Sequence, residues 1–327
     1  MRFRIIISIL FFLLNFAFAE ENSQKFLETL EPPLFGIVLK GDNLIIDIDA
    51  ENKFLKTNLA SYIKPQTPVI ISCVHKILPY FFIETTTVKG WFHKDNVKII
   101  FPEEFDKINN LNIVLLKKTL TIDGIIYPIA TKLPLLNERK KHYIVLLINQ
   151  EGFKEYRLPK TFATKFLKPS PKTLKTLTNL FKNKPYVWAN DERGWDCSGL
   201  IQDMFSFIDI TLPRNSFDQI NFTENIDVSN LSLKEKEKIL KKTKPYFTLL
   251  YFPGHIMLYI GKKGNELMSF QALSKIGDKK FGYVGVFPLK KTGLLSKVTK
   301  IGIIKGNVNN IATDSKQTFY NQGGGKL

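Results

Sequence analysis

Cysteine is scarce in this chain of 327 residues, which contains only two, Cys73 and Cys197. An exported protein held together by disulfides normally carries more cysteines, in pairs, so we expect no disulfide framework. Cys73 lies in the apolar run Pro68–Val74 and is interpreted as a buried strand residue. Because the cysteines and the four histidines form no cluster with metal-ligand spacing, the sequence predicts neither a metal site nor another cofactor.

Long apolar runs are also lacking, since the longest falls short of the roughly 20 residues that a membrane-spanning helix needs. That run, Ile5–Phe16, follows Arg2 and Arg4 and precedes the small-residue segment Ala17-Phe18-Ala19. The pattern is typical of a cleaved secretory signal over residues 1–19, with an uncleaved anchor as the alternative. No cysteine follows the run, which argues against a lipid anchor. We therefore expect an exported protein of the periplasm or cell surface, without a stable membrane span after signal cleavage.

Acidic residues are few, with 30 Asp and Glu against 47 Lys and Arg, which gives a formal net charge of +17. This excess favours an anionic partner, such as peptidoglycan with its carboxylated peptides or a membrane surface. It could also serve solubility alone. Export and the lack of zinc-finger spacing or an RNA-binding aromatic signature argue against nucleic acid.

Residues 34–159 alternate short apolar segments of strand length with turn signals such as Asp123-Gly124 and Lys89-Gly90. Such spacing predicts one or two small barrels. A boundary near Phe101-Pro102 would place an N-terminal segment and a first barrel in residues 20–102 and a second barrel in 103–168. The predicted strands are Val69–Val74, Tyr80–Glu84 and Val97–Ile100 in a first group, and Asn112–Leu116, Ile125–Ile129 and Tyr143–Ile148 in a second.

The pattern changes after the proline-bearing linker Lys168–Pro171, and residues 169–306 are expected to form one α+β domain. Helical spacing marks Lys172–Asn183 and Ser198–Ile208. The lysine-rich segment Leu231–Lys244 is interpreted as a solvated helix or surface insertion, and residues 307–327 as a disordered tail. The predicted strands are Thr248–Phe252, Ile256–Ile260, Glu266–Ala272, Tyr283–Phe287 and Val298–Ile304.

Cys197 has a setting unlike that of Cys73, because Asp196-Cys197-Ser198-Gly199 directly precedes an amphipathic helix. The helix macrodipole and the unpaired N–H groups at a helix start favour thiolate over thiol. The thiolate is the nucleophilic form of cysteine. The same N–H groups could bind the oxyanion that forms when a thiolate attacks an amide carbonyl.

A nucleophilic thiolate needs a base that can later protonate the leaving amine. His255 is the only histidine in the C-terminal part, where it follows Pro253-Gly254 and opens a predicted strand. Gln271, on the next predicted strand, could accept a hydrogen bond from the imidazole and fix its tautomer. The remaining histidines, His75, His93 and His142, are interpreted as surface or barrel residues.

These segments occur in an order that resembles the NlpC-type cell-wall peptidase family, whose fold is papain-like. The resemblance covers roughly residues 169–305. It implies Cys197 as nucleophile, His255 as base and Gln271 at the third position, with no metal. The motifs that carry it are Pro185-Tyr186-Val187-Trp188, Asp196-Cys197-Ser198-Gly199-Leu200-Ile201-Gln202, Leu212-Pro213-Arg214-Asn215-Ser216 with Gln219, and Gly254-His255-Ile256-Met257-Leu258-Tyr259-Ile260-Gly261.

The resemblance further implies that Asp196, Ser198 and Tyr186 border the pocket for the substrate's N-terminal side. Tyr186 could equally be a core aromatic residue. Arg214 belongs to the family's Leu-Pro-Arg turn, where a structural and a substrate-binding role are both open.

The sequence departs from the family pattern in three places. Ala189-Asn190 stands where two glycines are usual, and Pro245–Thr248 stands where the family commonly has Gly-Asp. Gln271 replaces the usual histidine, which could orient the imidazole less firmly.

The N-terminal strands are similar to bacterial SH3-like modules, on the basis of Tyr80–Thr85, Gly90-Trp91-Phe92 and Asp95-Asn96-Val97. In proteins that fuse such modules to these peptidases, the barrel often forms one wall of the substrate cleft. The expected architecture is therefore a papain-like α+β catalytic domain preceded by one or two small all-β SH3-like barrels.

The leading hypothesis is an exported, monomeric peptidoglycan endopeptidase that hydrolyses a stem-peptide amide, between D-glutamate and a diamino acid as the resemblance implies. A second hypothesis is a wall-binding protein whose catalytic domain is weak or inactive. A third is an exported effector whose thiolate performs deamidation or acyl transfer on a protein target.

Overall fold

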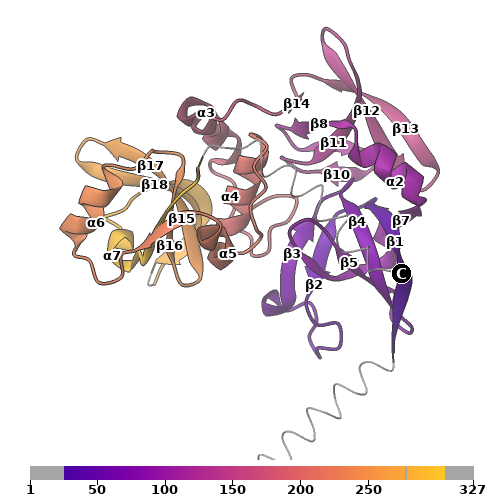
Figure 1. The fold of residues 1–327 in the computed structure, drawn as a ribbon, viewed down its shortest axis with the longest axis horizontal. Helices are drawn as coiled ribbons and strands as arrows, with labels where there is room; N and C mark the ends of the chain where they lie inside the picture. The colour runs from indigo at the N-terminus through magenta and orange to yellow at the C-terminus, as the bar shows by residue number, and fades with distance from the viewer. Residues whose placement is uncertain (1–25, 277, 306–327) are drawn as a thin grey trace, which may run out of the picture.

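The computed structural model describes residues 26–276 and 278–305, which form three units that follow one another along the chain (Figure 1). Each unit is built on an antiparallel sheet, and most of the helices belong to the third unit. The predicted secretory signal over residues 1–19 and the predicted tail over 307–327 lie outside the described residues. Within the described residues, no helix has both the length and the apolar character needed to cross a bilayer.

The first unit is a seven-stranded antiparallel sheet that curls around its own core. Val38, Leu44, Ile71, Ile83 and Phe92 are buried there, as expected for alternate residues that face inward from a curled sheet. In spatial order the strands are β3 (Leu59–Ile63), β2 (Asp42–Ile45), β6 (Lys89–His93), β5 (Tyr80–Glu84), β4 (Pro68–His75), β1 (Leu27–Val38) and β7 (Val97–Ile100).

Cys73 lies in β4, as predicted from its apolar surroundings, but its side chain is half-buried and not fully buried. The neighbouring His75 is buried, and its Nδ1 accepts hydrogen bonds from the backbone N–H groups of Ile77 and Leu78. Both residues are therefore parts of the sheet of the first unit.

The second unit begins with α2 (Pro102–Asn109) and continues into a five-stranded antiparallel sheet with an additional hairpin. It is fastened to the first unit by Gln66, whose side chain donates to the Ile148 carbonyl at 2.9 Å and accepts from the Ile148 N–H at 2.8 Å. The sheet order is β13 (Gly152–Pro159), β12 (His142–Asn149), β11 (Lys132–Glu138), β8 (Asn112–Leu116) and β14 (Ala163–Thr164), and the hairpin is β9 (Leu120–Ile122) with β10 (Ile125–Tyr127).

The third unit is a six-stranded antiparallel sheet with helices packed against it. The helices are α3 (Pro171–Phe181), α4 (Cys197–Ser206), α5 (Ser216–Asn221), α6 (Leu233–Leu240) and α7 (Leu294–Lys297). The sheet order is β15 (Glu224–Asp227), β20 (Lys300–Ile303), β16 (Thr248–Phe252), β17 (His255–Lys263), β18 (Glu266–Ile276) and β19 (Lys279–Pro288). The two helices and five strands predicted here from sequence pattern are all present, with small differences at their ends.

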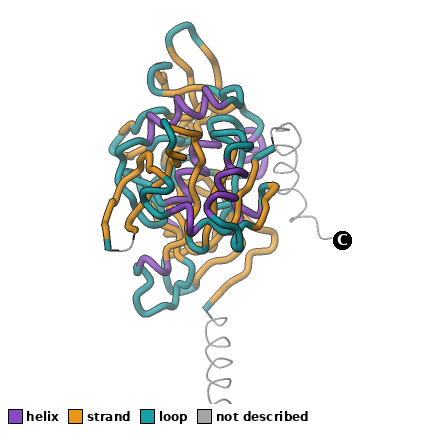
Figure 2. Tube along the Cα trace, turned by 90° about the vertical axis from the view of Figure 1, so that its left-hand side faces the viewer, coloured by secondary structure: helices purple, strands orange, loops and turns teal. Residues whose placement is uncertain are grey.

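α4 lies between the six-stranded sheet and the two N-terminal units, and it is buried on almost every side (Figure 1). Its residues Leu200 and Phe205 share one core with Leu258 and Phe270 of the sheet, and with Ala130 of the second unit. The third unit thus packs directly on the N-terminal units. Figure 2 views the molecule from the side of the third unit and shows helices lying among the strands.

The lysine-rich segment predicted to be a solvated helix or surface insertion does contain a helix, α6, but this helix is packed and not merely solvated. Ser232 and Glu235 form a capping box at its start. Lys236 is buried, and its ammonium donates to the carbonyls of Ser296 at 3.2 Å and Val298 at 2.7 Å. The lysine therefore joins the helix to the segment before β20.

Candidate active site

Cys197 is the first residue of α4, and its side chain is only 8% exposed. The preceding Asp196 caps the helix, because its Oδ1 accepts a hydrogen bond from the Gly199 N–H at 2.8 Å. The Cys197 sulfur lies within reach of two backbone N–H groups, those of Ser198 and of Ile256 in β17. The helix start and the neighbouring strand thus meet at the sulfur.

Burial, followed by the charge of Asp196, raises the pKa of the Cys197 thiol to about 11. The N–H of Ile256, the Arg214 guanidinium and the N–H of Ser198 act in the opposite direction. The helix start therefore lowers the thiol pKa as the sequence predicted, but desolvation outweighs it. The expectation that the helix start would leave thiolate as the favoured form is corrected: the thiol is protonated at neutral pH.

His255 is the first residue of β17, next to Ile256, so the strand that contacts the sulfur also carries the imidazole. Gly254 has a φ of 83°, which allows the tight turn between β16 and β17. His255 Nε2 lies 2.6 Å from Oε1 of Gln271 in β18. The pairing of histidine and glutamine that the sequence predicted is present.

A short chain of hydrogen bonds fixes the orientation of the Gln271 amide. Gln271 Nε2 donates to Ser269 Oγ at 2.8 Å, and Ser269 Oγ donates to the Phe287 carbonyl at 3.3 Å. Because the Ser269 hydroxyl donates its proton to the Phe287 carbonyl, its oxygen can only accept, and it accepts from the Gln271 amide N–H. Gln271 Oε1 is therefore directed at His255, from which it accepts a hydrogen bond. The neutral imidazole then carries its proton on Nε2 and its lone pair on Nδ1.

The His255 imidazole is neutral at pH 7, because burial lowers its pKa below the ordinary value. The hydrogen bond to Gln271 and the charge of Asp196 partly oppose this shift, and Lys297 adds to it. A neutral thiol and a neutral imidazole with a free Nδ1 form a pair in which the imidazole can take the thiol proton.

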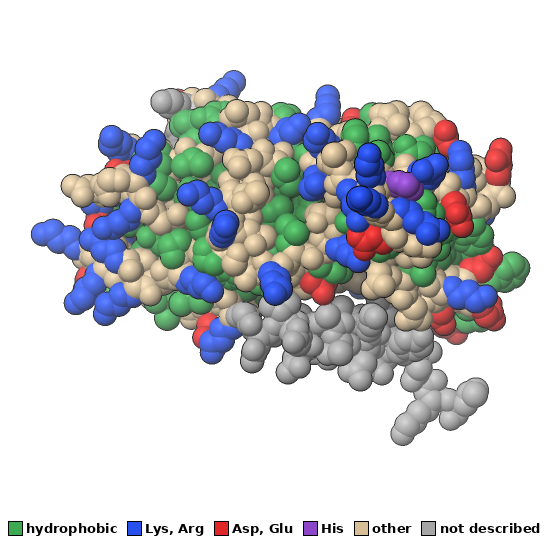
Figure 3. Space-filling view, turned by 90° about the horizontal axis from the view of Figure 1, so that it is seen from above, with side chains coloured by type: hydrophobic (Ala, Val, Ile, Leu, Met, Phe, Trp, Pro, Cys, Tyr) green, Lys and Arg blue, Asp and Glu red, His purple; other side chains and the backbone are tan. Residues whose placement is uncertain are grey.

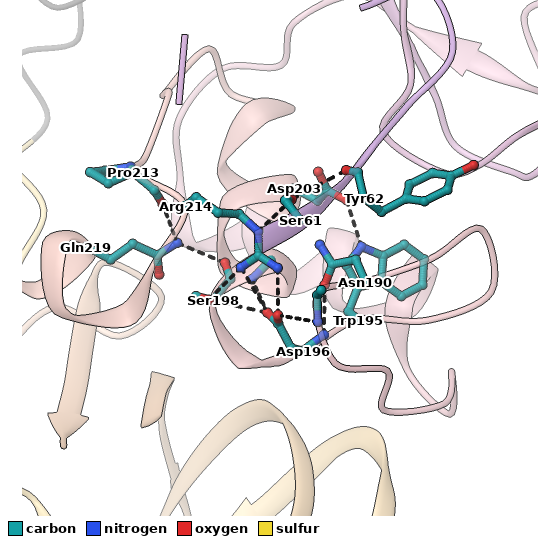
Figure 4. A network of polar contacts seen from close by, with 12 residues as sticks. Ser61, Tyr62, Asn190, Trp195, Asp196, Ser198, Asp203, Pro213, Arg214 and Gln219 are labelled. Carbon is teal, nitrogen blue, oxygen red and sulfur yellow. Dashed lines mark hydrogen bonds and ion pairs between the residues drawn. The ribbon is translucent and has the colours of Figure 1, made fainter. Parts of the chain in front are cut away.

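Asp196, Ser198 and Arg214 form a buried network beside Cys197 (Figure 4). Arg214 donates from Nη2 to Asp196 Oδ2 at 2.6 Å, from Nη1 to Asp196 Oδ1 at 3.2 Å and from Nη1 to Ser198 Oγ at 2.9 Å. Two-point pairing of a guanidinium with a carboxylate holds both groups in one geometry. Asp196 and Ser198, which the family resemblance implied at the substrate pocket, are thus bonded to Arg214, whose role the sequence left open.

Tyr186 is half-buried against the core of the third unit, and burial raises the pKa of its hydroxyl. The charges of Cys197 and Asp196 raise that pKa further, so the tyrosine lies close to both. Trp188, two residues on, keeps 47% of its side chain exposed. Tyr186 therefore contributes to the core, and its place at the substrate pocket stays a prediction.

Ala189 and Asn190, which replace the usual pair of glycines, both have left-handed backbone conformations, with φ of 61° and 67°. Glycine adopts this conformation without strain, whereas a residue with a Cβ does not. The Asn190 side chain compensates, because its Oδ1 accepts the Asp196 N–H at 2.8 Å. Gly199 provides the space for this side chain, since a Cβ there would lie 2.0 Å from Asn190 Nδ2.

The variant Ala189→Gly is expected to raise the free energy of unfolding by about 1 kcal/mol, because alanine in this conformation is strained. Urea denaturation measures the change. Ala163→Gly, in a buried strand with ordinary backbone, is the control and should instead destabilise the protein by about 0.5–1 kcal/mol. Equal destabilisation by both variants would contradict the strain assigned to Ala189.

The first unit contributes directly to this site through β3 and the residue after it. Ser61 Oγ accepts from Arg214 Nε at 2.7 Å, and the Tyr62 N–H donates to the Ala189 carbonyl at 2.7 Å. Lys64 pairs with Asp203 of α4 at 2.5 Å. These three residues were not predicted from the sequence, because their partners lie more than 120 positions away and no local pattern marks such a contact.

Asp203 also accepts a hydrogen bond from Trp195 Nε1 at 2.7 Å, so it links the first unit to the loop that precedes Cys197. Asp203 lies two turns into α4 and is buried. A buried carboxylate with both a cation and an N–H donor is a stable arrangement, whereas an unpaired one is not. The position of the first unit is therefore tied to the position of the nucleophile.

Residues 183–276, which include Cys197, His255 and Gln271, match the NlpC/P60 family. The chain contains an NlpC/P60 domain. This family comprises cysteine peptidases that hydrolyse peptidoglycan. The matched segment is a part of the third unit and does not include the two N-terminal units.

Two curated relatives share sequence with parts of the chain. A bifunctional muramidase/DL-endopeptidase of Bacillus subtilis is 31% identical over 113 residues, which cover 32% of this chain and 30% of the relative. A gamma-D-glutamyl-L-lysine dipeptidyl-peptidase of Bacillus cereus is 28% identical over 203 residues, 56% of each chain. The matches thus span less than two thirds of the length of either relative.

Two solved structures resemble the whole fold. An NlpC/P60 endopeptidase from Photobacterium damselae subsp. piscicida superposes with a TM-score of 0.66 at 17% identity, over 83% of this chain and 73% of the other. An NlpC/P60 family protein from Bacillus cereus superposes with a TM-score of 0.62 at 19% identity, over 82% of this chain and 98% of the other. This breadth extends the likeness beyond the NlpC/P60 domain to the N-terminal units.

Proposed function

We propose that the NlpC/P60 domain hydrolyses a stem-peptide amide of peptidoglycan, between D-glutamate and a diamino acid. Cys197 is the nucleophile, His255 the base and Gln271 the residue that orients the imidazole. The observation that carries this proposal is the arrangement on β17, where the N–H of Ile256 reaches the sulfur and the adjacent His255 is bonded to Gln271. The bond identity is supported by the names of the two curated relatives, a DL-endopeptidase and a gamma-D-glutamyl-L-lysine dipeptidyl-peptidase.

The reaction starts from the neutral pair of thiol and imidazole. His255 Nδ1 takes the thiol proton as the sulfur attacks the amide carbon, and the N–H groups at the start of α4 stabilise the oxyanion. The imidazolium then gives its proton to the leaving amine, and the C–N bond breaks to leave a thioester on Cys197. A water molecule, deprotonated by His255, hydrolyses the thioester and restores the thiol.

The architecture proposed around this chemistry is a papain-like catalytic domain over residues 169–306, preceded by SH3-like barrels over 20–102 and 103–168. The first barrel forms one wall of the substrate cleft, as its contacts through Ser61 and Tyr62 support. Asp196, Ser198, Tyr186 and Arg214 shape the pocket for the substrate's N-terminal side. Because the polar groups of Asp196, Ser198 and Arg214 are bonded to one another, these three residues set the pocket mainly by holding its geometry.

The location proposed for the protein is the periplasm or the cell surface, after export and removal of residues 1–19, and it acts there as a monomer. Its positive charge supports an anionic wall as partner. Figure 3 shows basic side chains spread over the face that carries the second unit. At one end of that unit an open groove is lined by Arg139, Lys140, Lys141 and Arg157, none of which is ion-paired with another described residue.

The proposal is tested by incubating the protein with purified muropeptides and following the products by mass spectrometry. Release of a fragment that begins with the diamino acid would support both the reaction and the bond. Binding to wall without any new product would favour the hypothesis of an inactive wall-binding protein. Loss of ammonia mass from a glutamine-bearing protein, without muropeptide cleavage, would favour the effector.

The pH dependence of kcat/KM is expected to be broad. The active pair of neutral thiol and neutral imidazole has one proton to transfer, and protonation of His255 removes the base. Because burial lowers the pKa of His255, activity is expected to fall only below the ordinary histidine pKa of 6.5. Loss of the thiol proton of Cys197 leaves the pair without a proton for the leaving amine. Because the pKa of Cys197 is raised to about 11, the rate is expected to decline only as the pH approaches that value. Steady-state kinetics across this range, with circular dichroism as a control for unfolding, measures both limbs. An acid limb above the ordinary histidine value would contradict the role of burial.

Gln271→Leu is expected to lower kcat roughly 10–100-fold with little change in KM, because the imidazole loses the acceptor that fixes its tautomer. Ser269→Ala should cause a smaller loss, since it frees the Gln271 amide to turn its N–H groups toward the imidazole. Gln271→His, which restores the residue usual in the family, is the rescue control and should keep activity. Unchanged kcat in Gln271→Leu would remove Gln271 from the mechanism.

A further inference from the structure

The side chain of Gln219, in α5, is fully buried, and the proposed mechanism leaves it without a role. Its Nε2 donates one hydrogen bond to the Ser198 carbonyl at 2.8 Å and another to the Pro213 carbonyl at 2.9 Å (Figure 4). The amide therefore joins three segments of the third unit: α5, the first turn of α4 and the turn that precedes Arg214.

The bond to the Ser198 carbonyl acts on the peptide group that follows the nucleophile by one residue. The carbonyl of this Ser198–Gly199 peptide group accepts from Gln219, and its N–H donates to Asp196 Oδ1 at 2.8 Å. Because a peptide group is planar and rigid, bonds at both of its ends prevent it from rotating. The backbone that carries Cys197 and the N–H groups at the start of α4 is therefore held in one conformation.

The two bonds also fix the orientation of the Gln219 amide and direct its oxygen away from both carbonyls. Gln219 Oε1 is buried and has no hydrogen-bond partner among the described residues. A buried acceptor without a donor costs free energy, which an apolar side chain of similar volume would avoid. Residues that break a packing rule in this way tend to lie at functional sites. The benefit of glutamine here lies in the two carbonyls that it holds.

A second glutamine provides a comparison within the same structure. Gln202 Nε2 donates to the Leu212 carbonyl at 2.8 Å, so this amide ties the same turn to α4. Gln202 lies five residues after Cys197, beyond the first turn of the helix. Gln202 thus holds the turn to the body of α4, whereas Gln219 holds it to the turn that bears the sulfur.

We propose that Gln219 is a positioning residue for the nucleophile, an inference that rests on the proposed function. It acts through the Ser198–Gly199 peptide group and keeps the Cys197 sulfur and the N–H groups at the start of α4 in the geometry that attack on an amide requires. Displacing a reacting atom by about 1 Å can cost roughly 100-fold in rate, so a loss of this hold has a large effect on the chemical step.

Gln219→Leu is expected to lower kcat on muropeptides roughly 10–100-fold. KM should change little, because Asp196, Ser198 and Arg214 keep the bonds to one another that shape the pocket. Gln202→Leu is the matched control, since it removes the same kind of bond from the same turn, and it should keep kcat near that of the wild type. Circular dichroism during heating shows whether both variants are folded.

Alkylation of Cys197 by iodoacetamide tests the inference without any peptidase activity. In a Cys73→Ala background Cys197 is the only thiol, and it is 8% exposed. Gln219→Leu should raise the alkylation rate roughly threefold or more, because local opening of the first turn exposes the sulfur. Gln202→Leu should leave that rate unchanged. A wild type that cleaves no muropeptide would contradict the proposed function, whereas the alkylation rates would still decide the role of Gln219.

The inference is overturned if Gln219→Leu keeps the wild-type kcat and alkylation rate, or if Gln202→Leu changes both as much as Gln219→Leu does. Should Gln219→Leu fail to fold, Gln219→Glu takes its place, since it keeps the volume of the side chain. A carboxyl group can donate at most one hydrogen bond, and only when protonated, so this variant should also lose kcat. Wild-type kcat and alkylation in Gln219→Glu would likewise overturn the inference.

Discussion

Replacing Cys197 with alanine is expected to abolish cleavage of muropeptides, with a fall in kcat of roughly 10⁴-fold or more. The variant keeps the start of α4 and the capping bond of Asp196 but removes the atom that attacks the amide carbon. The covalent route is then lost, and neither the oxyanion-binding N–H groups nor His255 can replace it. Mass spectrometry of a timed digestion measures the residual rate.

Cys73→Ala is the matched control, because it removes the other cysteine of the chain from a half-buried position in β4. It should retain wild-type activity and should leave Cys197 as the site of alkylation by iodoacetamide. If Cys197→Ala still cleaved muropeptides at a rate near that of the wild type, the nucleophile would lie elsewhere and the proposed mechanism would be wrong.

Replacing Arg214 with methionine is expected to lower the free energy of unfolding by about 3–5 kcal/mol, because it leaves the Asp196 carboxylate buried without its cation. The side chains of both residues are less than 10% exposed, and the pair is bonded through two nitrogens. The same change also removes the hydrogen bonds to Ser61 and Ser198, so the first unit and the start of α4 lose a common partner. Urea denaturation followed by tryptophan fluorescence measures the loss.

Arg193→Met provides the matched control. Arg193 makes a comparable two-nitrogen contact with Asp191, but its own side chain is 73% exposed. Because solvent screens exposed ion pairs, this variant should leave stability within the error of the measurement. The double variant Arg214→Met with Asp196→Asn should recover part of the loss, since the unpaired charge is gone. If Arg214→Met and Arg193→Met were equally mild, the buried pair would not hold the site together.

Part of the fold was predictable because its signals are local. The spacing of leucines gave α3, the capped amphipathic run gave α4, and alternating apolar runs gave β16, β17 and β18. Strand β1 was not among the predicted strands, because Pro32 and Pro33 interrupt its alternation and the register shifts between Thr29 and Leu34. Helix α2 was missed because it has only eight residues and its first, Pro102, was interpreted as a domain boundary.

The pairing of His255 with Gln271 was predictable for a similar reason, since a tight turn fixes which strands are neighbours and strand alternation fixes which faces meet. Ser269 was not predicted to take part, although it lies on the same face two residues before Gln271. Its role depends on the Phe287 carbonyl of β19, and the sequence does not show which carbonyl of a neighbouring strand is free to accept a hydrogen bond.

By itself, then, the sequence determined which residues form the thiol, imidazole and amide set, because each is marked by a helix start, a turn or a strand face within a few residues. Only the tertiary structure decided how these groups behave. The pKa of Cys197 rises because surrounding segments exclude water, and Arg214 meets Ser61 across 153 positions. Burial and long-range pairing are properties of packed surfaces, and no local pattern of residues encodes them.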